Sequence, residues 1–373
     1  MKKFLIIIYM VIFGLLAYTF IVKFYKAQIV KKEPIIIEQR NEESADSDVT
    51  TISLSFVGDC TIGWDPRYGY ATRFDKYLDD NNGDFAYYFA KVKDYLDQDD
   101  ITVANLEGQL TTSNDKVEKM FNFKAPTSYV NILKKGSVEM VSFANNHAYD
   151  FGKSGYDETI KTLDDNNVLH YGYSDYLIKK INGVKVGFMA FHDIDCVKYS
   201  EAKKGLDYLK ENGARLIIVS VHWGIEKDLI QNNAQQKMGR YLIDNGADLV
   251  IGTHPHVIQG IEKYNDKYIV YSLGNFVFGG NQNPPDKDTF MFRQTFTFYK
   301  QDLRLDDNIE IIPASVSGYK NKNNYQPVIL DGEEKLGYLI KLWNILVDLI
   351  INYNLNKKKK YYLLFCNLNI SSF

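Results

Sequence analysis

Cysteine is scarce in this chain of 373 residues, and the sequence motifs of several large enzyme classes are missing. The three cysteines, Cys60, Cys196 and Cys366, are widely spaced and odd in number, so the sequence implies no disulfide framework. Cys60 directly follows Asp59 and could ligate a metal as a thiolate, but we favour a plain buried side chain. A Gly-x-Ser-x-Gly elbow, a P-loop and a dinucleotide fingerprint are all absent, which argues against those enzyme classes.

Positive charge is not in excess either. The chain has 44 Lys and Arg against 47 Asp and Glu, and its formal net charge of −3 offers no electrostatic case for binding nucleic acid. Its hydrophobic content of 45% is sufficient for one large domain with appendages.

An uncharged apolar run, FLIIIYMVIFGLLAYTFIV, occupies residues 4–22. It is long enough to cross the hydrocarbon core of about 30 Å as a helix. Because no Ala-x-Ala cleavage pattern and no lipid-attachment cysteine follow it, we expect an uncleaved signal anchor. Lysines flank both of its ends, and we favour a short cytosolic N-terminus at residues 1–3. The protein is therefore expected in a bacterial cell membrane, single-pass, with the bulk of the chain outside.

Beyond the anchor, residues 23–50 are polar and charged and are typical of a linker, and residues 51–318 are predicted to form a folded domain. Strands and helices alternate there, which favours an α/β layered fold. The expected strands are 52–58, 101–106, 138–144, 184–191, 215–222, 247–252 and 267–273, and two more β segments are expected at 292–299 and 308–316. The expected helices are 85–98, 126–135, 154–167, 200–212 and 233–245.

Helix ends are marked by capping residues. Ser154 and Ser200 are expected N-caps, and Gly213 and Gly246 stand just past two helices. Residues 319–373 form a C-terminal tail of uncertain structure, which holds a tetralysine. Residues 336–351 suit an amphipathic helix, although a reading-frame slip would also account for this ending. We assign no function to the tail.

Polar side chains follow the apolar runs at the points where strands should end. The imidazoles there are His147, His222, His254 and His256, and the carboxylates are Asp59 and Glu107. In open α/β sheets, functional groups gather outside the carboxyl ends of the strands. We therefore interpret these residues as one site. His170 and His192 lie off the pattern and are expected to be structural.

Mixed carboxylate, amide and imidazole donors suit Mn, Fe, Zn or Mg better than a thiolate-loving metal. One or two such ions, shared by a carboxylate, would clamp a phosphoryl or acyl group and activate a water. A metal-free alternative uses His147 or His222 as a general base. His147 and Asp150 lie three residues apart at a strand-to-helix turn, close enough for one to orient the other.

Six short motifs occur in order between residues 52 and 318. They are GD at 58–59, NLEG at 105–108, NNHAYDFG at 145–152, VHWGIE at 221–226, GTHPHVIQGIE at 252–262 and YSLGNFVF at 271–278. This series resembles that of the CapA family, the poly-γ-glutamate capsule synthesis proteins related in fold to calcineurin-like metallophosphoesterases. The resemblance implies a four-layer α/β/β/α metallophosphatase-like sandwich, preceded here by one N-terminal transmembrane helix.

The resemblance also implies roles for single residues. The implied metal ligands are Asp59, Glu107, Asn146, His222, His254 and His256, and the implied catalytic histidine is His147. Asp150 is assigned as its catalytic partner from the spacing of the two residues and not from the resemblance. Two positions depart from the phosphoesterase pattern. The series Asp59-Cys60-Thr61 stands in place of Asp-x-His, and Glu107 stands in place of an aspartate. Since one ligand of the first metal is missing, we expect one divalent ion, or a second that is weakly held.

The leading hypothesis is a membrane-anchored CapA-type protein with a metal-dependent hydrolase or transferase site. It would act in synthesis, export or attachment of poly-γ-glutamate or another envelope polymer, with that anionic polymer and other membrane subunits of a capsule synthase complex as partners. A second hypothesis keeps the fold without catalysis, as a scaffold or polymer-binding subunit. A third is a secreted metallophosphoesterase or peptidase unrelated to capsule.

Overall fold

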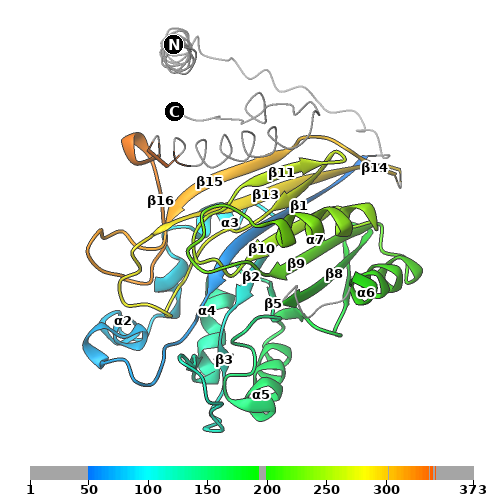
Figure 1. Cartoon of the computed structure of the whole chain (residues 1–373). Helices are drawn as coiled ribbons and strands as arrows, with labels where there is room; N and C mark the ends of the chain where they lie inside the picture. Colours follow the sequence, from blue (N-terminus) through cyan, green and yellow to red (C-terminus); the bar gives the residue numbers. More distant parts are fainter. Residues whose placement is uncertain (1–48, 193–198, 301, 336, 339–340, 342–373) are drawn as a thin grey trace, which may run out of the picture. The chain divides into compact units, whose positions relative to one another are not determined.

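A computed structural model of the chain describes residues 49–192, 199–300, 302–335, 337–338 and 341 (Figure 1). The expected anchor at 4–22, the linker up to residue 48 and the amphipathic segment beyond 341 lie outside the described residues. Within the described part of the chain, no helix is both long and apolar enough to cross a membrane.

Two mixed sheets form the centre of the domain. The strands of the larger sheet are, in spatial order, β16 (Val328–Ile329), β15 (Ile309–Ser315), β13 (Asp288–Tyr299), β1 (Val49–Cys60), β2 (Ile101–Leu106), β5 (Met140–Ser142) and β6 (Leu169–Tyr171), and β14 (Asp302–Arg304) pairs with β13. Strands β1, β2, β5 and β6 run parallel, whereas β13 is antiparallel to β1.

The smaller sheet has the order β11 (Ile261–Tyr264), β12 (Lys267–Val270), β10 (Leu249–Thr253), β9 (Leu216–His222), β8 (Val184–His192) and β7 (Leu177–Ile181). Its four inner strands are parallel, and both edge strands are antiparallel to their neighbours. A separate parallel pair joins β3 (Gln109–Leu110) to β4 (Lys124–Ala125).

Helices flank the sheets. The α-helices of the described residues include α2 (Phe74–Asp80), α3 (Lys93–Leu96), α4 (Val130–Lys135), α5 (Gly152–Asp165), α6 (Tyr199–Glu211) and α7 (Asn233–Asp244), and the 3₁₀ turns include η1 (Tyr70–Thr72), η2 (Phe85–Phe89) and η3 (Thr127–Tyr129). Figure 1 shows α6 and α7 beside β8, β9 and β10.

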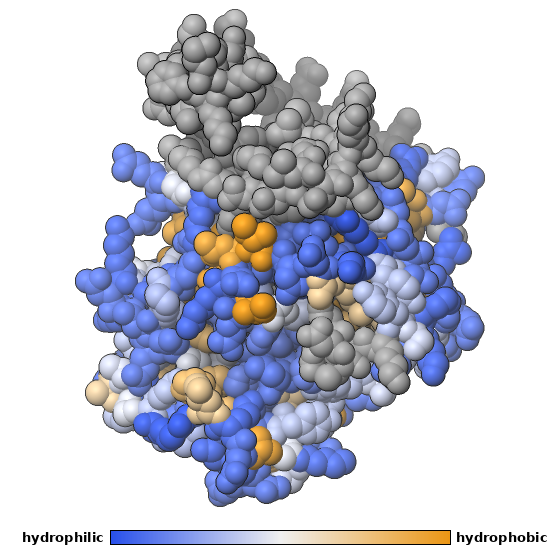
Figure 2. Space-filling view, viewed as in Figure 1, coloured by the Kyte–Doolittle hydropathy of each residue, from blue (hydrophilic) through white to orange (hydrophobic). Residues whose placement is uncertain are grey.

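Three buried clusters show how these elements form layers. One cluster lies between the sheets and joins alternate residues of β1, such as Leu54 and Phe56, to residues of the smaller sheet such as Ile218. A second packs the other face of the larger sheet against α2, α4 and α5, and a third packs β8, β9 and β10 against α6 and α7. The order is helix, sheet, sheet, helix, which confirms the expected four layers. Both sheets are covered on two faces, which is why their strands are nearly continuous apolar runs. The face seen in Figure 2 is correspondingly mostly hydrophilic, with small separate apolar patches.

Several sequence expectations need correction. The expected helix 85–98 is a 3₁₀ turn, η2, followed by the single short helix α3. Ser154 lies in the first turn of α5, which begins after Phe151, and Ser200 lies inside α6. Polar side chains near a helix start mark its neighbourhood without fixing its first residue.

Other boundaries are confirmed or extended. Gly213 and Gly246 adopt the expected positive φ, at 87° and 105°, just past α6 and α7. The ordered domain extends beyond the expected limit at residue 318, because β16 pairs with β15 and Leu330 and Tyr338 join the core.

Candidate metal centre

The site forms where the carboxyl ends of strands from both sheets meet. Asp59 is the second-last residue of β1 in the larger sheet, and Glu107 directly follows β2. His222 ends β9 in the smaller sheet, and His254 and His256 follow β10. Parallel strands place their carboxyl ends at one edge, so groups distant in sequence converge there.

The backbone beneath Asp59 allows almost no space. A Cβ atom at Gly58 would lie 2.0 Å from the carbonyl oxygen of Gly274, so only glycine fits. The N–H of Asp59 donates to that same carbonyl at 3.0 Å. This close approach fixes the end of β1 against the segment that carries Asn275, which pairs with Asp59 in an isolated bridge.

The turn after β10 is strained. His254 has φ of 101° and His256 has φ of 58°, values that residues other than glycine seldom adopt. Such strain is found where the surrounding structure fixes the conformation, and it is concentrated at functional sites. Pro255 between them holds both imidazoles on one turn.

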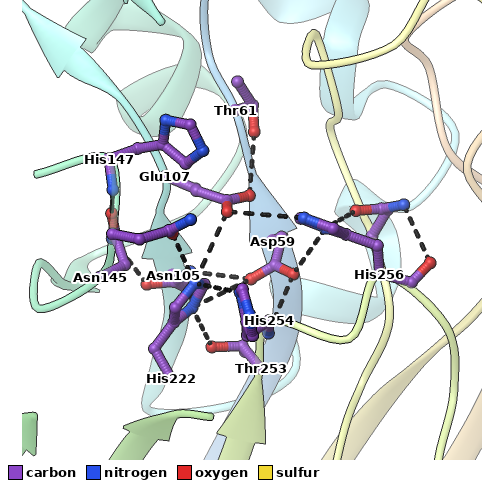
Figure 3. A network of polar contacts seen from close by, with 12 residues as sticks. Asp59, Thr61, Asn105, Glu107, Asn145, His147, His222, Thr253, His254 and His256 are labelled. Carbon is purple, nitrogen blue, oxygen red and sulfur yellow. Dashed lines mark hydrogen bonds and ion pairs between the residues drawn. The ribbon is translucent and has the colours of Figure 1, made fainter. Parts of the chain in front are cut away.

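The two carboxylates lie deep in the site (Figure 3). Asp59 Oδ1 accepts a hydrogen bond from Asn105 Nδ2 at 2.8 Å, and Oδ2 accepts one from the His254 N–H at 3.2 Å. Glu107 Oε2 accepts from the Thr61 hydroxyl at 3.2 Å. Glu107 Oε1 is buried without any hydrogen-bond partner, and imidazole nitrogens of His222 and His256 lie 3.6 and 3.8 Å from it.

The imidazoles form a connected group. Nε2 of His222 lies 3.0 Å from Nδ1 of His254 and 2.9 Å from Oδ1 of Asn146. Nδ1 of His222 lies 3.0 Å from the Thr253 hydroxyl. All six predicted ligands are thus brought together, and Asn146 lies on the exposed side.

The orientation of His256 follows from Asn275. The amide Nδ2 of Asn275 donates to the His256 carbonyl at 3.1 Å, so its Oδ1 faces His256 Nδ1 at 2.9 Å and can only accept. Nδ1 therefore carries a proton, and a metal ion that replaced a proton on the other nitrogen would be bound by Nε2, the atom that faces Glu107. A ring protonated on Nδ1 alone is the tautomer that a metal-ligating histidine needs.

Glu107, His254 and His256 each offer a ligand atom, and these atoms lie within 4.8 Å of one another. Burial, and then the negative charge of Asp59, raise the pKa of Glu107. Burial lowers the pKa of His254 to about 4, assisted by the charge of His256. Burial also opposes charge on His256, but the Glu107 and Asp59 carboxylates outweigh it and raise the pKa of this ring. Two buried carboxylates beside this group of imidazoles form an environment that a divalent cation would stabilise.

His147 and Asp150 form a second, adjoining pair. Nδ1 of His147 lies 2.8 Å from Oδ2 of Asp150, which also accepts from the Phe123 N–H at 2.6 Å. Asp150 Oδ1 forms an ion pair with Lys119. Burial lowers the pKa of His147, against the opposing effect of Asp150. In Figure 3, Glu107 lies between the His147 ring and His256.

The structure also shows where Cys60, His170 and His192 lie. Cys60 is fully buried in the core, and burial raises the pKa of its thiol to about 12, which suits a packing role. His170 pairs with Asp164 at 3.0 Å, away from the site. His192 lies beside His222 in the register of β8 and β9, nearer the site than its sequence position suggested.

Sequence reasoning missed the residues that hold the ligands in place. They are Thr61, Asn105, Asn145, Thr253 and Asn275. Several of them lie inside or beside the motifs, and Asn105 carried a signal of its own. It is a carboxamide within the otherwise apolar end of strand β2, and buried polar groups need partners.

Comparison with known proteins places this geometry in context. Residues 53–280 match the family described as bacterial capsule synthesis protein PGA_cap. The chain is 29% identical over 250 residues to the PGA biosynthesis protein CapA of Bacillus subtilis strain 168, covering 61% of this chain and 63% of that protein. It is 29% identical over 221 residues to the capsule biosynthesis protein CapA of Bacillus anthracis, covering 52% and 54%. The chain thus spans less than two thirds of the length of each of these relatives.

Among solved structures, a hypothetical protein from Thermus thermophilus aligns at a TM-score of 0.44 and 14% identity, covering 70% of this chain and 99% of that one. A 5'-nucleotidase from Candida albicans SC5314 aligns at 0.42 and 11%, covering 72% and 52%. At these TM-scores neither likeness bears on function.

Proposed function

Because this chain belongs to the bacterial capsule synthesis protein PGA_cap family, we propose that it acts in poly-γ-glutamate capsule assembly through a metal-dependent hydrolase or transferase site. The observation that supports a metal ion in this site is the environment of Glu107 Oε1. This oxygen is buried, has no hydrogen-bond partner and lies 3.8 Å from His256 Nε2. One carboxylate oxygen of Glu107 lies within 4.8 Å of ligand atoms of both His254 and His256. A buried carboxylate oxygen without a donor is costly unless a cation completes its environment.

The residues present fit one divalent ion. Glu107, His254 and His256 would hold it, with Asp59, His222 and Asn146 adjoining. Their oxygen and nitrogen donors suit Mn, Fe, Zn or Mg. Such an ion supplies Lewis-acid polarisation of a phosphoryl or acyl oxygen and a nucleophilic water at neutral pH.

The protein's own residues would supply positioning and proton transfer. Asp150 forms an ion pair with Lys119 and faces Nδ1 of His147, so the His147 proton would be held on Nδ1, and Nε2 would be left to accept or donate a proton at the reacting group. The low pKa of the buried ring keeps it neutral near pH 7, as a general base requires. Asn146, exposed beside His222, would contact the substrate side of the site.

The cellular setting is also proposed. Residues 4–22 would anchor the protein in the bacterial membrane as a single span, with the domain outside the cell. Other membrane subunits of a capsule synthase and the anionic polymer itself would be its partners. The CapA proteins of the two Bacillus species carry capsule or PGA biosynthesis in their names, which supports this assignment.

One observation favours a second candidate, a non-catalytic scaffold or polymer-binding subunit. Thr61 occupies the place where the phosphoesterase pattern has a histidine, and its hydroxyl is directed to Glu107. A site with one ligand fewer would hold metal more weakly. A secreted metallophosphoesterase or peptidase unrelated to capsule is the third interpretation of the same site.

Metal analysis separates these functions. The purified full chain is loaded with Mn, Zn or Fe and compared with the His254→Ala/His256→Ala double variant, with thermal unfolding as a check of folding. We expect about one equivalent in the wild type and none in a folded double variant. Failure of the wild type to take up any of these ions would refute the metal site and favour the scaffold. Capsule output unchanged by the double variant in cells would refute a catalytic role in capsule assembly.

A further inference from the structure

A buried carboxamide links the metal centre to the catalytic histidine. Asn105 lies on β2 with only 3% of its surface exposed, two residues before Glu107. It is neither a predicted ligand nor a predicted catalytic residue. Nevertheless its amide contacts Asp59 and His222 on one side and Asn145 on the other.

The direction of each hydrogen bond is set by groups whose roles are fixed. The His147 backbone N–H, which can only donate, lies 3.0 Å from Asn145 Oδ1. Asn145 Nδ2 donates to the Leu106 carbonyl at 2.8 Å, and that oxygen can only accept. Asn145 must therefore present its N–H groups to Asn105, at 3.1 Å from Oδ1.

The same logic orients Asn105. Its Oδ1 accepts from Asn145 and lies 3.4 Å from the Ser142 hydroxyl. Its Nδ2 is consequently turned toward Asp59 Oδ1, 2.8 Å away, and toward His222 Nδ1, 3.2 Å away. A continuous chain of hydrogen bonds thus runs from the His147 backbone N–H through the side-chain amides of Asn145 and Asn105 to the Asp59 carboxylate.

We infer that Asn105 is a positioning residue that fixes the Asp59 carboxylate for metal binding and couples it to the segment carrying His147. The inference rests on the proposed metal site. Asn105 donates to Oδ1 of Asp59 and the His254 N–H donates to Oδ2, so each oxygen of the carboxylate is held by a donor of the protein. Partners of this kind are worth about 10- to 100-fold in metal affinity when they are removed.

The test measures metal affinity rather than turnover. The full chain is titrated with Zn²⁺ against a chromophoric chelator, and its Co²⁺ form is examined by visible absorption, which reports ligand geometry. Asn105→Asp keeps the shape but replaces a donor by an acceptor beside Asp59, and Asn105→Ala removes the amide. Asn324→Ala is the matched control, because Asn324 is a buried, hydrogen-bonded asparagine on a different part of the domain.

Both Asn105 variants should bind Zn²⁺ about 10- to 100-fold more weakly and change the Co²⁺ spectrum. Asn324→Ala should lower the unfolding temperature without changing either. Should the Asn105 variants fail to fold, Asn145→Ala provides the second measurement. It removes the donor that orients Asn105, and we expect a smaller loss of affinity with the same kind of spectral change.

Two failures are distinguishable. Wild-type affinity and spectrum in folded Asn105 or Asn145 variants would overturn the inference and leave the metal site standing. Absence of Zn²⁺ and Co²⁺ binding by the wild type would overturn the proposed function and the inference together.

Discussion

The hydroxyl of Thr61 donates a hydrogen bond to Oε2 of Glu107 at 3.2 Å, within the fully buried floor of the site. One oxygen of the longer carboxylate is therefore held by the protein, and the other is left facing the imidazoles. The residue that departs from the expected Asp-x-His pattern has a definite place in this site, as the donor that orients Glu107.

Thr61→Val tests that role. The substitution preserves shape but leaves Glu107 Oε2 without its donor, which should cost about 1–3 kcal/mol of unfolding free energy and weaken metal binding. Chemical denaturation and metal titration measure the two effects. Thr289→Val is the control, because the Thr289 hydroxyl is equally buried but donates to the Leu273 carbonyl. Equal metal affinity in both variants would contradict a role for Thr61 at the site.

Gly58→Ala should be among the most damaging single-methyl changes in the domain. The added Cβ would meet the Gly274 carbonyl oxygen at 2.0 Å, so backbone must move at the residue preceding Asp59. We expect a loss of about 2–4 kcal/mol in denaturant unfolding, with weakened metal binding. Gly69→Ala is the control, since nothing lies within 4 Å of its Cβ position and its φ is −65°. Equal free energies of unfolding for the two variants would contradict the close approach of β1 to the Gly274 carbonyl.

Asp150→Asn separates metal binding from proton transfer. The amide keeps the volume but no longer fixes the His147 proton on Nδ1, and Lys119 loses its charged partner. Turnover of any substrate that the wild type cleaves should fall by about 10²- to 10⁴-fold. Metal content should stay unchanged, and a loss of metal would instead place Asp150 in the metal centre.

Metal removal should lower stability. An ion that binds only the folded state adds about 2.7 kcal/mol at a free concentration of about 100 times its Kd. Thermal unfolding with and without a chelator should therefore differ by several degrees in the wild type. The His254→Ala/His256→Ala variant should show no such difference, and an equal chelator effect in that variant would point to a different metal site.

Acid stability should depend on Asp65. Burial disfavours its charge, but hydrogen bonds from Arg67 and from the Asn122 N–H prevail and lower its pKa to about 2. A carboxylate with a folded-state pKa below its unfolded value of about 3.9 stabilises the protein above that value, and the contribution is lost as pH falls toward 2. Arg67 is more than half exposed, so we expect only about 1–2 kcal/mol.

The measurement compares the wild type with Asp65→Asn by denaturant unfolding at about pH 7, 4 and 2.5, which bracket the unfolded pKa. The stability difference should be full at neutral pH and shrink steadily below about pH 4. A difference independent of pH would show that the Asp65 charge contributes nothing to folding.

Much of the fold followed from local patterns. Apolar runs such as RLIIVSV and DLVIG, separated by amphipathic segments, specified β9, β10 and α7 because strands covered on both faces must be apolar throughout. Helix ends were located only where glycine was required, at Gly213 and Gly246, since a positive φ is a local property. The prediction of one helix at residues 85–98 was wrong, because in the packed domain this segment forms the 3₁₀ turn η2 and the separate short helix α3.

The residues of the site also fall into a group that the sequence predicted and a group that only the structure revealed. The sequence by itself determined which groups would meet, because Asp59, Glu107, His222, His254 and His256 all follow strand ends and parallel strands share one edge. Only the tertiary structure decided how they are held. Thr61, Asn105 and Asn275 act on residues 46 or 19 positions away, and no local pattern encodes a hydrogen bond across that distance. Their roles arise because buried polar groups must be paired, and pairing is settled only when the two sheets have packed together.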